Sequence, residues 1–396
     1  MIVTVVSEAP ERVGLAALAR YFLRLGTIGF GGPVALVGYM HRDLVERRRW
    51  LSQDDYSLGL ALAQVMPGPL AAQLAMAIGF LKAGFAGATV VGLAFILPSF
   101  LMVVGLAALY VAYAGLWWVS ALFYTVGASV IAIIAIAAYK LSRTTNKRDP
   151  LCWAIFVVLF LATVVAQAEL AELFILAGLV VVVVRARPSW PRARGRSMPI
   201  LIALPPLVAG AATATAPGTD TLVPMFLFFV KAGAFVFGSG LAIVPFLHQG
   251  VVQEFGWLNE HQFLDAVAVA IITPGPVVIT VAFIGYLAAG LTGSIVAALG
   301  MFLPVYLFTI GPVPWFKRNR NNPQLRAFVT GATAAATGAI AGAVVVLGER
   351  AIIDMPTALV ALASLAILLR SKVPEPLVIG ASGAIGLVLW PLLGRV

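Results

Sequence analysis

The chain carries an internal repeat at a fixed offset of 207 residues, so that residues 22–69 align with residues 229–276 without a gap. Of the 48 aligned positions, 15 hold the same residue in both copies. In the first copy these are Phe22, Gly26, Phe30, Gly31, Ala35, Val37, His41, Val45, Trp50, Leu51, Ala61, Ala63, Pro67, Gly68 and Pro69. Matching helix breakers in the two halves of an apolar chain are typical of secondary transporters.

The composition places this repeat in a lipid bilayer. Hydrophobic residues make up 61% of the 396 residues and charged residues 11%, with a mean hydropathy of +1.02. A soluble domain carries about 25% charged residues, so we expect an all-α polytopic membrane protein. The chain has one cysteine, Cys152, and three histidines. These are too few for a disulfide framework or a zinc site, and we expect no metal or other cofactor.

The formal net charge of +10 comes mainly from cations that cluster in short gaps between apolar segments. Five such clusters lie at residues 42–49, 140–148, 185–196, 317–326 and 370–372. Cytoplasmic loops of membrane proteins carry this kind of excess of Lys and Arg. The charge therefore marks loops on the cytoplasmic side, and we predict no nucleic-acid partner.

The apolar stretches fall into two kinds. A full crossing needs about 20 apolar residues, and the predicted full spans are 84–112, 116–139, 151–168, 170–184, 199–217, 290–312, 327–347, 356–369 and 376–393. Four other stretches contain a helix break, namely 14–40, 56–82, 225–248 and 262–287. Because Pro removes an amide donor and Gly adds no rigidity, such backbone is tolerated at membrane depth only beside protein or a water-filled cavity.

The basic clusters distinguish two topologies. If the four broken stretches are re-entrant hairpins, nine full spans place all five clusters in the cytoplasm and the two repeats are inverted relative to each other. If the broken stretches cross instead, there are thirteen crossings, and the cluster at 42–49 faces outward against the rule. The predicted domains are a first transmembrane repeat at 1–184, a basic loop and linker span at 185–218, and a second transmembrane repeat at 219–396.

At these positions the chain resembles the chromate ion transporter family in its long, two-repeat form. The first half carries the pattern F-x-R-x-G-x-x-x-F-G-G-P, followed by Trp50-Leu51, Pro67-Gly68-Pro69 and Leu97-Pro98-Ser99. The second half repeats it in a weaker form, with Phe237-Gly238-Ser239-Gly240, Trp257-Leu258, Pro274-Gly275-Pro276 and Leu303-Pro304. Ser239-Gly240 stands where the first half has Gly32-Pro33, so two sites, one in each repeat, would not bind a ligand identically.

The resemblance implies a multi-pass protein of the bacterial inner (cytoplasmic) membrane. Members of the family are described as exporters that expel chromate, use the proton motive force and so confer chromate resistance. Some members move sulfate or related oxyanions.

Two cations at equivalent positions are candidates for binding a dianion. Arg24 and Lys231 are related by the repeat offset, and each lies six residues before its Phe-Gly break inside an apolar stretch. A cation in lipid costs at least ~2.5 kcal/mol, so a positive charge at both positions suggests a use. Chromate is a tetrahedral dianion, which two converging cations would neutralise. The alternative is that both side chains snorkel to lipid phosphates.

The helix breaks supply the other predicted contacts. A helix that begins at mid-membrane presents unpaired amide donors and the positive end of its dipole to an anion. The predicted contacts at the breaks are Phe30, Gly31, Gly32, Pro33, Pro67, Gly68, Pro69, Gly238, Ser239, Gly240, Pro274, Gly275 and Pro276, with Gln64 and Thr273 as neighbouring polar side chains. The alternative is that Gly and Pro merely permit close helix packing.

Proton coupling needs a titratable group in a cavity. The candidates are Asp265 and the equivalent pair His41 and His248. Asp265 lies nine residues before Pro274, and a solvated position at the membrane interface is its alternative. The histidines titrate in the appropriate range, with a structural hydrogen bond as the favoured alternative.

The leading interpretation is a proton-coupled antiporter that exports chromate by alternating access between inverted halves. The alternatives are an uptake carrier for sulfate or another oxyanion, and an anion channel. A membrane enzyme is disfavoured, because the sequence contains no recognisable nucleophile-base set. The expected partners are the dianion, protons and the bilayer. A homodimer is a further expectation, since symmetric folds of this kind often dimerise.

Overall fold

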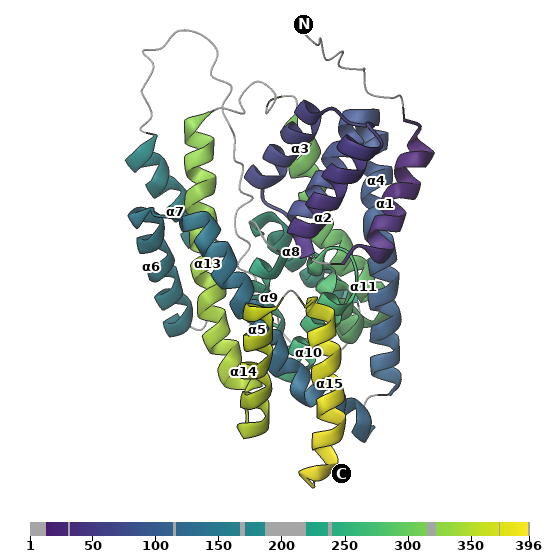
Figure 1. The fold of residues 1–396 in the computed structure, drawn as a ribbon, viewed down its shortest axis with the longest axis vertical. Helices are drawn as coiled ribbons and strands as arrows, with labels where there is room; N and C mark the ends of the chain where they lie inside the picture. Colours follow the sequence, from purple (N-terminus) through teal and green to yellow (C-terminus); the bar gives the residue numbers. More distant parts are fainter. Residues whose placement is uncertain are drawn as a thin grey trace, which may run out of the picture.

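The computed structural model describes residues 13–30, 32–113, 116–166, 171–186, 219–236, 240–313, 322–371 and 373–394, together with residue 315. All secondary structure in these residues is helical, with no strand among them. The prediction of an all-helical polytopic membrane protein is confirmed. Figure 1 shows an elongated helical bundle in which the first helices and the last helix lie at opposite ends.

The two halves contain the same order of elements. The first half comprises α1 (Leu15–Ile28), α2 (Gly32–Met40), the π-helix η1 (His41–Arg47), α3 (Gln53–Val65), α4 (Leu70–Ala112), α5 (Trp117–Asn146), α6 (Pro150–Ala166) and α7 (Ala171–Arg185). The second half comprises α8 (Thr219–Phe235), the 3-10 helix η2 (Gly240–Ile243), α9 (Val244–His248), the π-helix η3 (Gln249–Glu254), α10 (Glu260–Ile272), the 3-10 helix η4 (Val277–Ile279), α11 (Thr280–Ile310), α13 (Pro323–Ala351), α14 (Met355–Arg370) and α15 (Glu375–Leu392).

The broken stretches of the sequence are pairs of short helices. α1 has 14 residues and α10 has 13, and at about 1.5 Å per residue each spans roughly 20 Å. The hydrocarbon core of a bilayer is about 30 Å thick, so neither helix can cross it alone. This length suits a re-entrant hairpin, but two such helices in series could also form a broken crossing. The number of crossings stays a prediction.

A sharp kink divides each of the two helices that follow a Pro-Gly-Pro turn. It falls at Gly84 in α4 (φ 61°, ψ −146°) and at Gly290 in α11 (φ 62°, ψ −155°), a region of backbone space that favours glycine. In α4 the two arms touch, because a Cβ at Gly79 would collide with the backbone of Gly87. The kinks therefore separate the last arm of a broken stretch from the full span that follows, as the apolar pattern predicts.

The later helices are exchanged between the halves. α5 packs against α14 and α15 of the second half and also against α13, and α13 packs most extensively against α6 and α7 of the first half. Small residues let these backbones approach closely. A Cβ at Gly386 of α15 would collide with the carbonyl oxygen of Ala121, and one at Gly331 of α13 with that of Ala177. The two halves are interlocked rather than side by side.

The predicted full spans coincide with helices or helix arms, except for residues 199–217, which lie outside the described residues. Five of the described helices are long and apolar enough to cross a membrane, and shorter apolar helices accompany them. One boundary differs from the prediction, because α5 continues to Asn146 and carries Lys140 and Arg143 on its last turns. Lys and Arg are good helix formers, so the basic cluster continues this helix rather than ending it.

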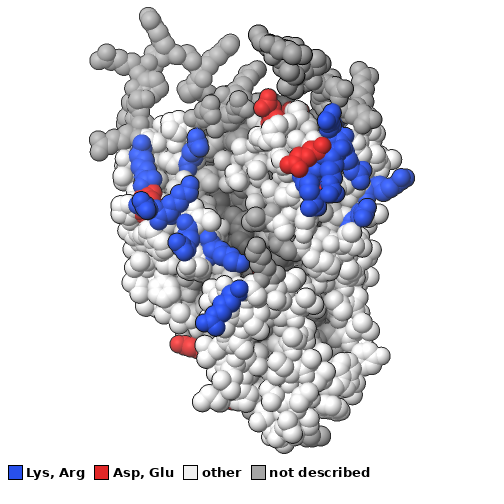
Figure 2. Space-filling view, viewed as in Figure 1, with Lys and Arg blue, Asp and Glu red and all other residues white. Residues whose placement is uncertain are grey.

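The charges are unevenly distributed. In Figure 2, the lysines and arginines on the visible face lie on the upper and middle parts of the molecule, and the lowest part, over the start of α14 and the end of α15, shows none. The upper part holds α1 to α3 in the same view. One end of the bundle is therefore distinctly basic.

Candidate substrate site

The Pro-Gly-Pro turn of each half contacts the helix break of the other half. The amide of Gly68 donates a hydrogen bond to the carbonyl oxygen of Val236 (2.5 Å), and the amide of Gly275 donates one to that of Gly29 (3.2 Å). Gly68 and Gly275 are equivalent in the repeat, and so are Gly29 and Val236. Each Pro-Gly-Pro turn thus meets the residue just before the Phe-Gly break of the opposite half, in two reciprocal contacts.

Both turns require glycine at their centre. Gly68 has a φ of 143° and Gly275 a φ of 104°, which L side chains rarely adopt. Space is also lacking, because a Cβ at Gly68 would lie 2.6 Å from the side-chain amide of Gln73. At Gly275 it would collide with the hydroxyl of Ser99.

Two buried polar side chains hold these turns. Gln73 donates from Nε2 to the carbonyl oxygen of Pro67 (2.7 Å), and Ser99 donates from Oγ to that of Pro274 (2.6 Å). The Oε1 atom of Gln73 is buried and has no hydrogen-bond partner among the described residues. Sequence reasoning assigned Ser99 no role, although it follows the Leu-Pro motif, because its partner is 175 positions away in the chain.

Helix N-termini lie directly beside the turns. α4 begins at Leu70 and η4 at Val277, and their N-caps, Pro69 and Pro276, make no side-chain capping hydrogen bond. The first amides of such helices have no intrahelical partner, and they carry the positive end of the dipole. The arrangement can therefore offer donors to an anion, and their use in substrate binding stays a prediction.

The other predicted contacts have varied surroundings. Phe30 and Gln64 are exposed, and Pro33 is half-buried. Thr273 is buried, but its hydroxyl donates to the carbonyl oxygen of Ala270 in its own helix (3.1 Å). Gly32 begins α2 and Gly240 begins η2, and a Cβ at Gly240 would lie 3.4 Å from Val277 beside the Pro-Gly-Pro turn of its own half. The remaining predicted positions, Gly31, Gly238 and Ser239, lie outside the described residues.

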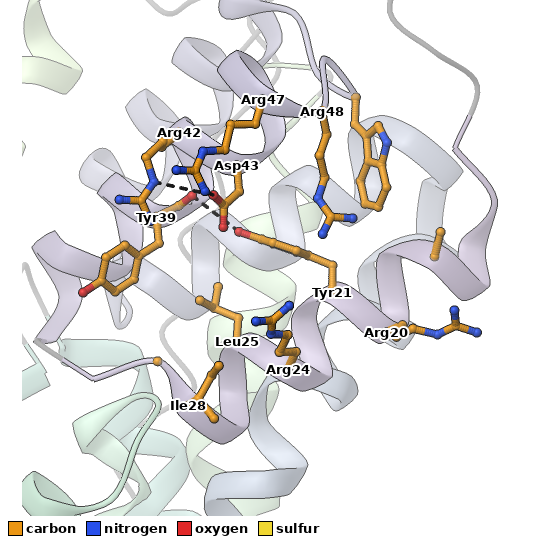
Figure 3. Close-up of a pocket in the computed structure, with 13 residues that line it drawn as sticks. Arg20, Tyr21, Arg24, Leu25, Ile28, Tyr39, Arg42, Asp43, Arg47 and Arg48 are labelled. Atoms are coloured by element: carbon orange, nitrogen blue, oxygen red, sulfur yellow. Dashed lines mark hydrogen bonds and ion pairs between the residues drawn. The ribbon is translucent and has the colours of Figure 1, made fainter.

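A basic pocket of about 670 Å³ adjoins the break after α1. One aspartate, Asp43, and five arginines line it: Arg20, Arg24, Arg42, Arg47 and Arg48. Figure 3 shows Arg42 and Arg47 around Asp43 and Arg24 below them, while Arg20 points away. Gly29, which accepts the hydrogen bond from the opposite turn, also lines the pocket. The pocket therefore reaches one of the reciprocal contacts.

The arginines of this pocket differ in their partners. Arg42 and Arg47 lie 3.6 and 3.7 Å from the carboxylate of Asp43. Arg48 lies over the ring of Trp50, 4.6 Å from its centroid. Among the described residues, Arg24 has no ion-pair partner. The pocket thus holds a guanidinium that an anion can engage without breaking an ion pair. Arg42, Arg47 and Arg48 belong to the basic cluster that the sequence places in a loop, and their position near Arg24 was not predicted.

Lys231 has different surroundings from Arg24. Both side chains are exposed, but the ammonium group of Lys231 on α8 lies 5.7 Å from the ring centroid of Phe246 in its own half. It does not line the basic pocket. The joint binding of one dianion by Arg24 and Lys231 stays a prediction.

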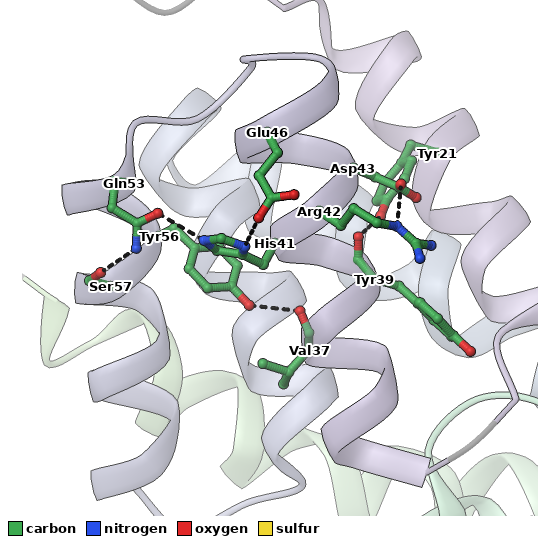
Figure 4. A network of polar contacts seen from close by, with 10 residues as sticks. All are labelled: Tyr21, Val37, Tyr39, His41, Arg42, Asp43, Glu46, Gln53, Tyr56 and Ser57. Carbon is green, nitrogen blue, oxygen red and sulfur yellow. Dashed lines mark hydrogen bonds and ion pairs between the residues drawn. The ribbon is translucent and has the colours of Figure 1, made fainter.

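The two candidate histidines lie in equivalent hydrogen-bond networks. His41 Nε2 lies 2.8 Å from Gln53 Oε1, and His248 Nε2 lies 2.7 Å from Glu260 Oε2. Glu260 takes the place of Gln53 in the second repeat, and Arg350 of α13 forms an ion pair with it. Figure 4 shows His41 between Gln53 and Glu46. Each histidine thus ties the helix after a break to the helix before a Pro-Gly-Pro turn.

His248 lies outside the candidate membrane-spanning helices. Burial, followed by the charge of Arg350, lowers the pKa of its imidazole to about 4. The ring is therefore neutral near pH 7. This state suits the structural hydrogen bond that the sequence favours over a proton-carrying role.

The third candidate for proton coupling is buried. The side chain of Asp265 is 5% exposed and accepts a hydrogen bond from the hydroxyl of Tyr110 (2.8 Å). The carboxyl is therefore packed inside the bundle rather than exposed on its surface, and its role in proton coupling stays a prediction. Asp265 lies more than two helical turns before Pro274. Its helix, α10, packs against α5, α11 and α15, and this packing covers the side chain of Asp265.

The comparisons with known proteins agree with one another. A family model described as chromate transporter matches residues 16–184 and 223–387. The chain is 56% identical to a chromate transport protein of Cupriavidus metallidurans over 380 residues, covering 96% of this chain and 94% of the relative. It is 54% identical to a probable chromate transport protein of Synechococcus elongatus over 379 residues, covering 95% and 96%.

A more distant relative also extends over both halves. It is a chromate transport protein of Pseudomonas aeruginosa, 29% identical over 405 residues that cover 97% of this chain and 95% of the relative. No solved structure matches the chain.

Proposed function

Because the chain belongs to the chromate transporter family, we propose that it exports chromate across the bacterial cytoplasmic membrane in exchange for protons. The protein is a multi-pass membrane protein of a transporter family. We propose, beyond this family membership, that transport is directed outward, is coupled to protons and gives resistance to chromate. Chromate is a tetrahedral dianion, and the proposed contacts are cations and amide donors.

The reciprocal contacts of the broken helices carry this proposal. Each Pro-Gly-Pro turn docks on the break of the opposite half through one amide, from Gly68 to Val236 and from Gly275 to Gly29. A movement of one half against the other must change both contacts together. Such paired, breakable contacts at the centre of two related halves suit alternating access, in which the site opens to one side of the membrane as it closes to the other.

The basic pocket gives the anion a route to this centre. Five arginines against one aspartate leave the lining with an excess of positive charge, which raises the local concentration of a dianion. Arg24 lies about one and a half helical turns before Gly29, the C-cap of α1. We propose that chromate first engages Arg24 and then the first amides of η4, directly after the turn of Gly275.

The proposed orientation places the basic pocket in the cytoplasm. Cytoplasmic segments are enriched in Arg and Lys, and the basic end of the bundle contains this pocket. In the hairpin topology, the first two broken stretches enter from the cytoplasm and the equivalent stretches enter from outside. The repeats are then inverted.

Thiol accessibility distinguishes the hairpin topology from thirteen crossings. In a Cys152→Ala background, Arg47→Cys is expected to resist impermeant thiol reagents in whole cells and to react after permeabilisation. Ser120→Cys, near the start of α5, is exposed and is expected to react in whole cells. Labelling of Arg47→Cys from outside would contradict the hairpins and favour thirteen crossings.

Transport in inside-out vesicles tests the function. Radiolabelled chromate is expected to accumulate when the vesicle lumen is acidic and to accumulate less when the proton gradient is collapsed. Sulfate is added as a competitor. Preferred sulfate transport would identify a carrier for that dianion, and chromate flux independent of the proton gradient would favour a channel.

A further inference from the structure

A second cavity lies outside the proposed chromate route. It has a volume of about 370 Å³ and is lined by residues of α4, α5, α10 and α15 and by residues at the end of α13 and just beyond it. That volume is enough for several waters, since each takes about 30 Å³ in the liquid. Its lining is polar in part, with Tyr110, Ser120, Tyr124, His261 and Asp265. The cavity can therefore bring water to a buried carboxyl.

We propose that the carboxyl of Asp265 in this cavity carries the proton that is exchanged for chromate. This inference rests on the proposed antiport. Its ligand is a proton delivered by water, and its partner in the binding site is the hydroxyl of Tyr110, 2.8 Å from Asp265 Oδ2.

The surroundings of Asp265 favour a group that changes its protonation state. Among the described residues that line the cavity there is no lysine or arginine. A buried carboxylate without a cation is costly, so the carboxyl is stable there when protonated. Ionisation then needs water to enter or the packing to change.

Two other titratable groups near the cavity, Tyr124 and Glu260, have partners. Tyr124 of α5 donates a hydrogen bond to Asp354, the N-cap of α14. Glu260, at the start of α10, is held by Arg350 of α13 and His248 of α9. His261 is exposed one helical turn before Asp265. It therefore stands where a proton would enter, while Asp265 lies further inside.

The position of Asp265 links the proton to the proposed substrate site. Its partner Tyr110 lies on α4 of the first half, so their hydrogen bond joins the halves. Asp265 also lies on α10, which leads directly to the turn at Gly275. The intervening nine residues extend about 14 Å along a helix. A change at Asp265 and a change at the turn can therefore be coupled through a single rigid element.

The hairpin topology makes the two cavities face opposite sides of the membrane. In that topology the end of the α4 span, the start of α5 and the end of α13 lie outside, and all three contribute to the lining of this cavity. The basic pocket lies on the cytoplasmic side. The proton would thus enter from outside, whereas chromate would enter from the cytoplasm. These are the opposite directions that antiport requires.

The test separates coupling from binding in reconstituted vesicles. Asp265→Asn is expected to reduce uptake driven by a pH gradient, and proton release per chromate, by about tenfold or more, within the usual range of coupling between two sites. Exchange of labelled for unlabelled chromate without a gradient needs no net proton movement, so it is expected to persist. Asp265→Glu should restore part of the proton flux. Gly105→Ala, outside this cavity and with no atom within 4 Å of the added Cβ, is the control and should leave both activities unchanged.

The outcomes separate this inference from the antiport itself. Undiminished proton flux per chromate in Asp265→Asn would overturn the role of Asp265, while the antiport would stand. Gradient-independent transport by the natural chain would overturn the antiport instead. If Asp265→Asn also loses chromate exchange, the variant Tyr110→Phe tests the role of Asp265 instead. It keeps the carboxyl of Asp265 but removes the hydrogen bond to it. A shifted pH profile of driven uptake in that variant supports the inference, and an unshifted profile contradicts it.

Discussion

Alanine in place of either central glycine of the Pro-Gly-Pro turns is expected to reduce chromate transport by about tenfold or more. At Gly68 and Gly275 the backbone has a positive φ, and a Cβ would meet Gln73 or Ser99. Strain of this kind costs of order 1–3 kcal/mol, and about 1.4 kcal/mol is a tenfold change in an equilibrium. Because each glycine amide also makes a contact between the halves, Gly68→Ala and Gly275→Ala should impair the conformational step. Initial rates of labelled chromate uptake measure the effect.

A glycine without these constraints provides the control. Gly105 lies in the second arm of α4, and a Cβ there would have no atom within 4 Å. Gly105→Ala is therefore expected to transport normally, with the same amount of protein in the membrane. Wild-type transport rates in both turn variants would contradict a role in transport and would mean that the turns only permit close helix packing.

Removal of the charge of Arg24 is expected to raise the apparent Km for chromate by roughly tenfold or more. A hydrogen bond to a charged group contributes about 1.5–3 kcal/mol, and Arg24 has no competing ion pair among the described residues. The maximal rate should change less, because the turns remain intact. Lys231→Gln should also raise Km if the cation of the second half contacts the same dianion.

Arg20→Gln is the matched control for Arg24→Gln. Both arginines lie on α1 and line the same pocket, but Arg20 points away from it (Figure 3). Its loss should therefore leave Km nearly unchanged. Snorkelling to lipid predicts the opposite for Arg24, namely a lower amount of protein in the membrane and an unaltered Km. Saturation curves normalised to membrane protein distinguish the two.

The positions of the helices and their breaks could be predicted from the sequence. Apolar length and Pro or Gly punctuation act within a few residues, so the spans, the turns at Pro67 and Pro274, and the repeat follow from local chemistry. The predicted full spans also begin at residues 84 and 290, where the structure has its kinks. Charge placement carried the predicted orientation, because the positive-inside rule also acts on short segments.

The partners of these elements depend on the tertiary structure. A repeat states that two segments are alike, but not that each turn docks on the break of the other half, as Gly68 does on Val236 and Gly275 on Gly29. Nor does it indicate that α5 packs on α14 and α15 while α13 packs on α6 and α7. The burial of Asp265, the gathering of arginines around Arg24 and the role of Ser99 are likewise decided by packing. They depend on contacts between residues far apart in the chain, and no local pattern of hydropathy or turn chemistry encodes which distant surfaces meet.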